Sequence, residues 1–182
     1  MEITTVGELL HWSYANLAMA HSAVTAKAGG YGRSQFMIRS RLYAGLNKGT
    51  MSIRPIVEDE RLKLILPQAC CYCGDNNRLS ADHLVPTKRG GPNTGDNLIW
   101  ACRSCNSSKG ARDMLEWLAE RDQFPTILLL RRYLKLAIEI SRGSDLMSTP
   151  ITAAPELPYS LSAIPTTYPA PAQLRLWVID LS

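Results

Sequence analysis

The sequence predicts an α+β protein in which a small mixed core is flanked by helices and followed by an extended arm. Five cysteines fall within residues 70–105, apolar residues recur at helical spacing on both sides of them, and six of the eleven prolines lie in residues 150–171. We therefore divide the chain into a helical basic region (1–57), a core (58–120), a single helix (121–146) and a Pro-rich extended arm (147–182).

Composition narrows the classes of function. A formal net charge of +4 and a pI of about 8.9 favour a nucleic-acid partner without requiring one. The sequence has no apolar run of about 18 residues, so we predict no membrane span. The opening MEITTVGELLHW lacks a basic segment and a cleavage site, which predicts a cytoplasmic location. In that reducing compartment cysteines bind metals more often than they form disulfides.

The first region is expected to form two helices, over residues 4–27 with a cap at Thr4 or Thr5, and over residues 33–47. Six basic residues and no acidic residue lie between residues 27 and 54. Such a stretch can neutralise phosphates, and we assign nucleic-acid contacts to Arg33, Arg39, Arg41 and Lys48. The alternative is an amphipathic helix with a solvated basic face.

Two further helices are expected, over residues 58–66 and residues 126–141. The prolines exclude a regular helix or a central strand from residues 150–171. The arm ends in QLRLWVIDL, whose alternation predicts a terminal strand that pairs with the body or with another chain.

Two CxxC pairs, separated by 28 residues, predict a metal site. A two-residue gap lets both sulfur atoms of a pair reach one ion, and four thiolates suit tetrahedral zinc. A site with four cysteine ligands is closed, so this zinc is expected to be structural. Cys71 falls outside the pairs and is expected to pack. We call the two segments the zinc knuckles; their ligands are Cys70, Cys73, Cys102 and Cys105.

Several motifs occur in order in and between the knuckles: Cys70-x-Tyr72-Cys73-Gly74, Asp82-His83-x-x-Pro86, Gly90-Gly91, Asp96-Asn97, and Cys102-x-x-Cys105-Asn106-x-x-Lys109-Gly110. This pattern resembles the HNH endonuclease family over about residues 70–110. The regions on either side carry no such resemblance.

The resemblance implies a ββα-metal core, in which a two-stranded hairpin packs on a helix with one divalent metal ion between them. By position, His83 would be the general base that activates water. Asp82 and Asn106 would hold a catalytic Mg²⁺ or Mn²⁺, and Asn97 would orient the loop that bears the histidine. The family often has a histidine where this chain has Asn106.

The residue types also fit this chemistry by themselves. An imidazole accepts a proton near neutral pH, and oxygen ligands suit a hard cation that stabilises developing charge on a phosphate. Adjacent Asp82 and His83 point to opposite faces of a regular strand, so the strand is expected to end or twist there. We assign contacts with the substrate backbone to Arg103, Lys109 and Arg112. His11 and His21 are expected to have no role in function.

The residues and the resemblance together predict a metal-dependent DNA endonuclease. Restriction, another anti-phage defence, mobile-element homing and phage DNA packaging are all compatible settings, and we favour restriction or anti-phage defence. A single site cuts one strand at a time, so double-strand cutting would need a homodimer. One alternative is a zinc-stabilised nucleic-acid-binding module without turnover. Another is a protein–protein scaffold in which the Pro-rich arm is the ligand segment.

Overall fold

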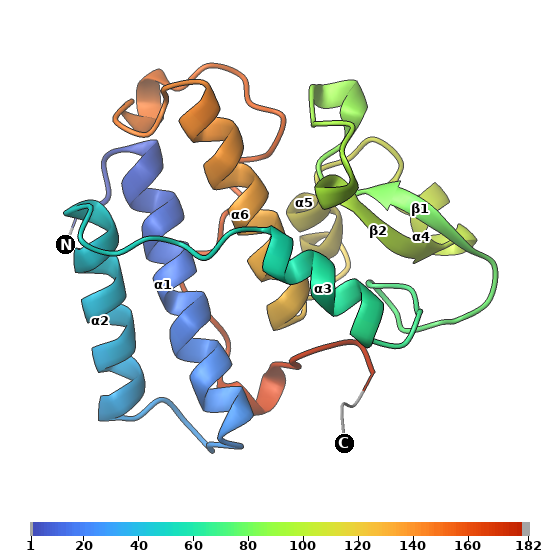
Figure 1. Ribbon diagram of the computed structural model, residues 1–182, viewed down its shortest axis with the longest axis horizontal. Coiled ribbons are helices and arrows are strands. Elements are labelled where there is room, and N and C mark those ends of the chain that lie inside the picture. The colour runs from blue at the N-terminus through green and yellow to red at the C-terminus, as the bar shows by residue number, and fades with distance from the viewer. Residues whose placement is uncertain (1, 180–182) are drawn as a thin grey trace.

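Helices and one small sheet make up the protein. The computed structural model describes residues 2–179, apart from the side chains of residues 60, 62 and 64. Within that part, six α-helices accompany a single two-stranded antiparallel sheet, which confirms the predicted α+β class. Figure 1 shows α2, α1 and α6 side by side at one end of the molecule, the sheet with α4 and α5 at the other end, and α3 between them.

The first two helices form a pair. α1 (Val6–Thr25) begins at a capping box, in which the Thr5 hydroxyl accepts from the Glu8 amide and the Glu8 carboxylate accepts from the Thr5 amide. α2 (Arg33–Asn47) packs on α1 through an edge-to-face contact between Trp12 and Tyr43. α2 buries only two of its residues, so most of its surface faces solvent.

α6 (Ile127–Gly143) is the central helix, and most of its residues are buried. It packs against α1, and α3 (Val57–Ile65) is tied to it by a buried ion pair between Asp59 and Lys135 at 2.5 Å. One continuous hydrophobic core joins α1 and α6 to the segment that holds the cysteines. The small core predicted from the cysteines is therefore stabilised by packing against the helices.

The sheet and two short helices carry the predicted motifs. β1 (Leu79–His83) pairs antiparallel with β2 (Leu98–Cys102), with Leu79 opposite Cys102 and His83 opposite Leu98. Two 3-10 turns, η1 (Thr87–Arg89) and η2 (Gly95–Asn97), lie in the connection between the strands. α4 (Arg103–Lys109) follows β2 directly, and α5 (Met114–Ala119) begins at an N-cap formed by Asp113.

The Pro-rich arm packs on the body of the protein and does not extend away from it. Within its described residues, 147–179, the regular structure consists of the 3-10 turns η3 (Ile151–Ala153) and η4 (Pro171–Gln173) and an isolated antiparallel bridge between Pro150 and Thr5. Four of its side chains join the core: Leu157, Tyr159, Ile164 and Leu174. This packing argues against the alternative of a protein–protein scaffold, in which the arm would be a free ligand segment.

The predicted terminal strand is absent from residues 173–179, and residues 180–182 lie outside the described residues. The carbonyls of Arg175 and Leu176 accept from the amides of Ile127 and Leu128, at 2.9 and 3.2 Å. These amides belong to the first turn of α6 and have no partner within the helix. They therefore bind the arm carbonyls that would otherwise accept from a neighbouring strand. The prediction failed because alternation gives a strand only where an open strand edge is available.

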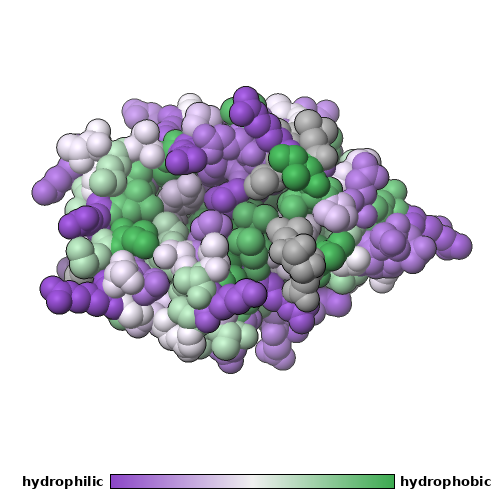
Figure 2. All heavy atoms as spheres, turned by 60° about the horizontal axis from the view of Figure 1, so that its bottom comes forward, coloured by the Kyte–Doolittle hydropathy of each residue, from purple (hydrophilic) through white to green (hydrophobic). Residues whose placement is uncertain are grey.

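The surface is mixed in polarity. Figure 2 shows hydrophobic side chains between hydrophilic ones on one face. Among the described residues the most exposed large hydrophobic side chains are Phe36, Met37, Ile38, Met51, Val57, Ile65 and Trp100. Within the same part of the chain, no helix combines the length and the apolar character needed to cross a membrane.

Candidate active site

The two zinc knuckles meet at one point. The sulfur atoms of Cys70, Cys73, Cys102 and Cys105 all lie within 4.8 Å of one another, and those of Cys73 and Cys102 are 3.7 Å apart. With Zn–S bonds of about 2.3 Å, the edge of a tetrahedron is about 3.8 Å. The set therefore fits a zinc ion, as the spacing predicted.

Local backbone geometry explains why the first knuckle forms. The Gly74 amide donates to the Cys70 carbonyl at 2.8 Å, and Gly74 has a φ of +81° that suits a residue without a Cβ. Cys71 is buried outside the set of four. Burial raises the pKa of its thiol to about 12, so it stays a neutral packing residue.

Three of the predicted residues line one cleft of about 210 Å³. Asp82 and His83 come from the end of β1, and Asn106 comes from α4, which crosses beside it. β1 ends at His83, as expected for adjacent side chains that both have to reach one site. The other residues of the cleft come from the loops after β1 and α4: Pro86, Thr87, Lys88, Gly110 and Ala111.

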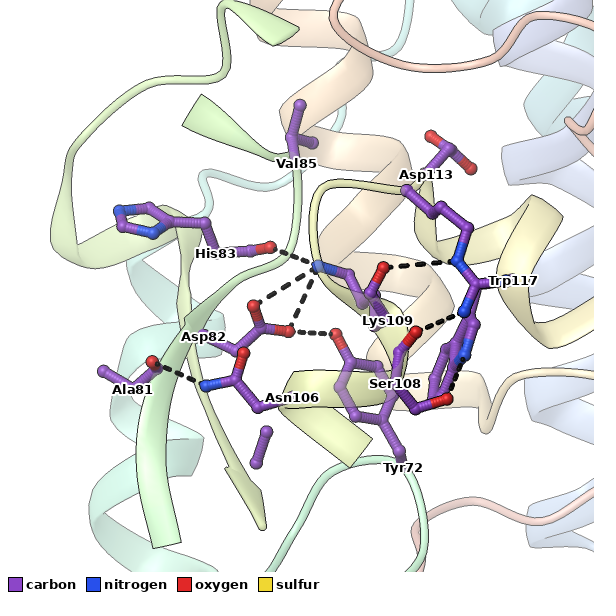
Figure 3. Close-up of polar contacts among 12 residues, drawn as sticks. Tyr72, Ala81, Asp82, His83, Val85, Asn106, Ser108, Lys109, Asp113 and Trp117 are labelled. Carbon is purple, nitrogen blue, oxygen red and sulfur yellow. Dashed lines mark hydrogen bonds and ion pairs between the residues drawn. The ribbon is translucent and has the colours of Figure 1, made fainter. Parts of the chain in front are cut away.

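Asp82 is a buried carboxylate with two donors. The Tyr72 hydroxyl donates to its Oδ2 at 2.7 Å, and the Lys109 ammonium lies 3.2 Å from Oδ2 and 3.3 Å from Oδ1 (Figure 3). Burial, reinforced by the charge of Asp82, raises the pKa of Tyr72 well above its usual value, so the phenol remains a donor. The carboxylate is therefore held by two donors and is only 6% exposed.

His83 lies half-buried at the edge of the cleft. Its Nε2 is 2.9 Å from the Asn93 Oδ1, and its backbone carbonyl accepts from Lys109 at 2.9 Å. An amide oxygen can only accept, so Nε2 carries the proton in this arrangement. In the neutral ring, Nδ1 is then the nitrogen that can accept a proton.

Asn106 completes the cleft through its side-chain amide. Its Nδ2 donates to the Ser80 hydroxyl at 3.0 Å and to the Ala81 carbonyl at 3.4 Å, which fixes the orientation of the amide. Its Oδ1 has no hydrogen bond within the described residues, and Figure 3 shows it next to the Asp82 carboxylate. A carboxylate and an amide oxygen side by side fit a hard divalent ion such as Mg²⁺ or Mn²⁺.

Asn97 lies beneath the loop that bears the histidine and is fully buried. Its Oδ1 accepts from the Val85 amide at 2.8 Å, and its Nδ2 donates to the carbonyls of Val85 and Pro92 at 2.7 and 2.8 Å. One side chain thus ties the segment that leaves β1 to the segment that approaches β2. This placement is the one expected of a residue that orients the histidine loop.

Replacing Asn97 with alanine is expected to destabilise the protein by about 2–4 kcal/mol, because buried backbone groups lose their partners. For a chain of this size, the thermal midpoint should fall by about 5–15 °C. Thermal melting followed by circular dichroism checks this. Asn76→Ala, at an exposed position, is the matched control and should melt like wild type. Equal melting of Asn97→Ala and wild type would show that these bonds do not stabilise the loop.

Two of the basic residues that we assigned to the substrate backbone have internal partners. Lys109 is 1% exposed and pairs with Asp82, so it does not lie where it can contact DNA. Arg112 donates to the carbonyls of Ser108 and Lys109 at the end of α4 and pairs with Glu120. The spacing of these residues in the sequence does not reveal that Lys109 is buried or that Arg112 binds the last carbonyls of a helix. Arg103 is exposed, at the start of α4.

The basic residues of α2 lie far from the cleft, at the opposite end of the molecule (Figure 1). Arg33, Arg41 and Lys48 are exposed. Arg39 differs from them: its guanidinium stacks on Trp12 at 4.7 Å and donates to Asn16 at 3.3 Å. Its place is thus between α1 and α2.

Sequence reasoning missed Lys88, which is exposed and lines the cleft beside His83. It has no hydrogen-bond or ion-pair partner within the described residues, whereas the neighbouring Arg89 lies 3.5 Å from Glu116. The only feature of the sequence that could have indicated this role for Lys88 is its position between Pro86 and Gly90-Gly91. His11 and His21, expected to have no role, lie away from the cleft, and burial lowers the pKa of both.

Comparison with known families agrees with this geometry. The family model described as HNH endonuclease matches residues 70–112. Neither the curated proteins nor the solved structures gave a match. The match begins at the first zinc cysteine and includes every residue of the cleft, so it covers the sheet, α4 and the four-cysteine cluster. Residues 70–112 are therefore similar to the HNH endonuclease family and carry four cysteines placed as in a zinc site.

Proposed function

We propose that the protein is a metal-dependent endonuclease that hydrolyses phosphodiester bonds in DNA at the cleft of Asp82, His83 and Asn106. The observation that carries the proposal is the grouping of a half-exposed imidazole, a carboxylate held by two donors and an oriented amide oxygen in one cleft. These are the groups that water activation and charge stabilisation at a phosphate require.

In the proposed reaction, the Nδ1 of His83 removes a proton from water as the oxygen attacks phosphorus. The bond from phosphorus to the 3′ oxygen then breaks, and the 3′ oxygen takes a proton from solvent water, which leaves a 5′-phosphate and a 3′-hydroxyl. Asn93 holds the His83 ring through Nε2. Asn97 fixes the loop that follows His83 and contains Asn93. Asp82 and Asn106 would hold Mg²⁺ or Mn²⁺, which supplies positive charge to the phosphate and the leaving oxygen.

The experiment that tests this activity is incubation of supercoiled plasmid with the zinc-loaded protein in Mg²⁺, in Mn²⁺ and in EDTA. We expect nicked or linear plasmid with either ion and intact plasmid in EDTA, because the proposed step depends on a divalent ion. Cleavage that is equally fast in EDTA would contradict the proposed role of the ion. Intact plasmid, single-stranded DNA and RNA under all conditions would contradict nuclease activity itself.

One observation favours a second candidate, a zinc-stabilised nucleic-acid-binding module without turnover. Lys109 already neutralises Asp82, so the carboxylate is satisfied without a divalent ion. Under this alternative, DNA would bind equally well with and without Mg²⁺, and no product would form. The free Oδ1 of Asn106 and the exposed His83 are better explained by the enzyme.

The proposal extends to assembly and setting. One such site cuts one strand, so double-strand cutting would require a homodimer. The molar mass of the protein in solution tests the proposed homodimer. A monomer of 20.2 kDa in the presence of DNA would contradict the dimer. We place the activity in restriction or anti-phage defence, in a reducing cytoplasm where the zinc thiolates persist. Phage that plate equally well on cells with wild type and with His83→Ala would contradict this setting.

We further propose that α2 is a second contact for long DNA, through Arg33, Arg41 and Lys48. These cations are exposed, and α2 has no acidic residue. Replacing all three with alanine is expected to weaken binding of a long duplex. It should also reduce the slope of log K against log salt by up to about 3, since each phosphate contact contributes about 0.9.

Because α2 and the cleft lie at opposite ends of the molecule, DNA length separates their contributions. A duplex of about 10 base pairs spans only about 34 Å, and its binding at the cleft should not change in the triple variant. Filter binding at several salt concentrations measures both duplexes. Ser34→Ala on the same helix and Arg175→Ala on the arm are the controls. An unchanged salt slope for the long duplex would remove α2 from the interface.

A further inference from the structure

Tyr72 connects the zinc site to the candidate active site. It lies between Cys71 and Cys73 in the first knuckle, and its hydroxyl donates to the Oδ2 of Asp82 at 2.7 Å. The Cys71 amide donates to the Trp100 carbonyl at 2.8 Å, which fastens the knuckle to β2. The backbone that carries Tyr72 is therefore held by the zinc ligands on both sides and by the sheet.

The ring of Tyr72 is fixed as firmly as its backbone. It meets Trp117 edge to face, with ring centroids 4.9 Å apart. Trp117 is 1% exposed, and its indole Nε1 donates to the Ser108 hydroxyl at 3.1 Å (Figure 3). An aromatic side chain with both ends restrained can place its hydroxyl in only one position, and that position is at Asp82.

The bond to Tyr72 defines how Asp82 faces the cleft. In the view of Figure 3, Tyr72 and Lys109 approach the carboxylate from one side, while Asn106 lies on the other. Lys109 lies at nearly equal distances from both carboxylate oxygens, 3.2 and 3.3 Å, so it does not distinguish Oδ1 from Oδ2. Tyr72 contacts only Oδ2 and thereby leaves Oδ1 as the oxygen without a short bond.

We propose that Tyr72 is a positioning residue, which uses the order of the zinc knuckle to orient Asp82 toward the catalytic divalent ion. This inference rests on the proposed function, in which Asp82 is a ligand of that ion. Zinc occupancy and affinity for the second ion are then linked through a single hydroxyl. A hydrogen bond to a metal-ligating carboxylate commonly changes metal affinity by about 10–100-fold.

The test is Tyr72→Phe in the full-length, zinc-loaded protein. This variant keeps the ring and its contact with Trp117 and removes only the donor. We expect unchanged zinc content and thermal midpoint, and a Mn²⁺ affinity about tenfold weaker, measured from the spin-resonance signal of free Mn²⁺. Cleavage should slow at low Mn²⁺, recover at high Mn²⁺ and keep its KM for DNA.

Two control variants make the outcome decisive. Tyr159→Phe also removes a buried hydroxyl bond, to Ser141 in the arm-to-α6 contact, and should bind Mn²⁺ like wild type. Asp82→Ala should lose Mn²⁺ binding. If Asp82→Ala loses Mn²⁺ and Tyr72→Phe does not, the inference is wrong and the proposed ion site stands. If Asp82→Ala binds Mn²⁺ normally, both are wrong. Loss of zinc from Tyr72→Phe would also overturn the inference, because the hydroxyl would then serve the knuckle.

Discussion

Replacing His83 with alanine is expected to slow DNA cleavage by about 10²- to 10⁴-fold, the range that a general base contributes. The physical reason is that His83 lines the cleft with its Nε2 held by Asn93, which leaves Nδ1 as the nitrogen proposed to take the proton. No other histidine lines the cleft within the described residues. Single-turnover cleavage of a labelled duplex at saturating Mg²⁺ measures the chemical step directly.

The binding of DNA separates this prediction from a loss of structure. His83→Ala should bind the duplex as wild type does and keep its zinc, since His83 is not one of the four cysteine ligands and its side chain is not part of the hydrophobic core. His21→Ala is the matched control, because His21 lies on α1, away from the cleft. Equal rates for all three proteins would remove His83 from the reaction.

Removal of the zinc is expected to have the largest effect on the fold. Structural zinc contributes about 10–16 kcal/mol of apparent binding energy in zinc-finger peptides, more than the whole stability of many domains. Cys73→Ala leaves three ligands, so this variant should lose its zinc and the order of residues 70–112. Because those residues share one core with α1 and α6, the helices should melt at a lower temperature as well.

The neighbouring cysteine supplies the control. Cys71→Ala removes a buried thiol that lies outside the four-cysteine set, and this variant should keep one zinc per chain. Elemental analysis of the purified proteins and thermal melting measure the two effects. A Cys73→Ala protein that melts like wild type would show that the helices and the arm stabilise the domain without the metal.

The features that sequence predicted well are those fixed by neighbours along the chain. A chelating pair such as Cys70 and Cys73 has to be close in sequence to form a knuckle, so its spacing carries the prediction. The helices were found for a similar reason: their periodicity and caps are local, as the capping box of Thr5 and Glu8 shows. The family pattern then linked the two knuckles to Asp82, His83 and Asn106, which the structure brings together in one cleft.

The features that sequence did not predict depend on contacts between distant segments. Lys109 lies in a polar motif, yet its side chain is buried, where its ammonium binds Asp82 and the His83 carbonyl. Arg39 and Arg41 lie two residues apart in the same basic helix, but only Arg39 stacks on Trp12. Similarly, the arm takes a path fixed by the free amides at the start of α6, which no local pattern reveals.

The most direct measurement of the central claim is the cleavage of an end-labelled DNA duplex by zinc-loaded wild type and His83→Ala, in Mg²⁺ and in EDTA. We predict products with a 5′-phosphate and a 3′-hydroxyl from wild type in Mg²⁺ alone, while His83→Ala binds the duplex and cleaves it about 10²- to 10⁴-fold more slowly. Cleavage by His83→Ala at the wild-type rate, or by wild type in EDTA, would contradict the assignment of this cleft as a metal-dependent nuclease site.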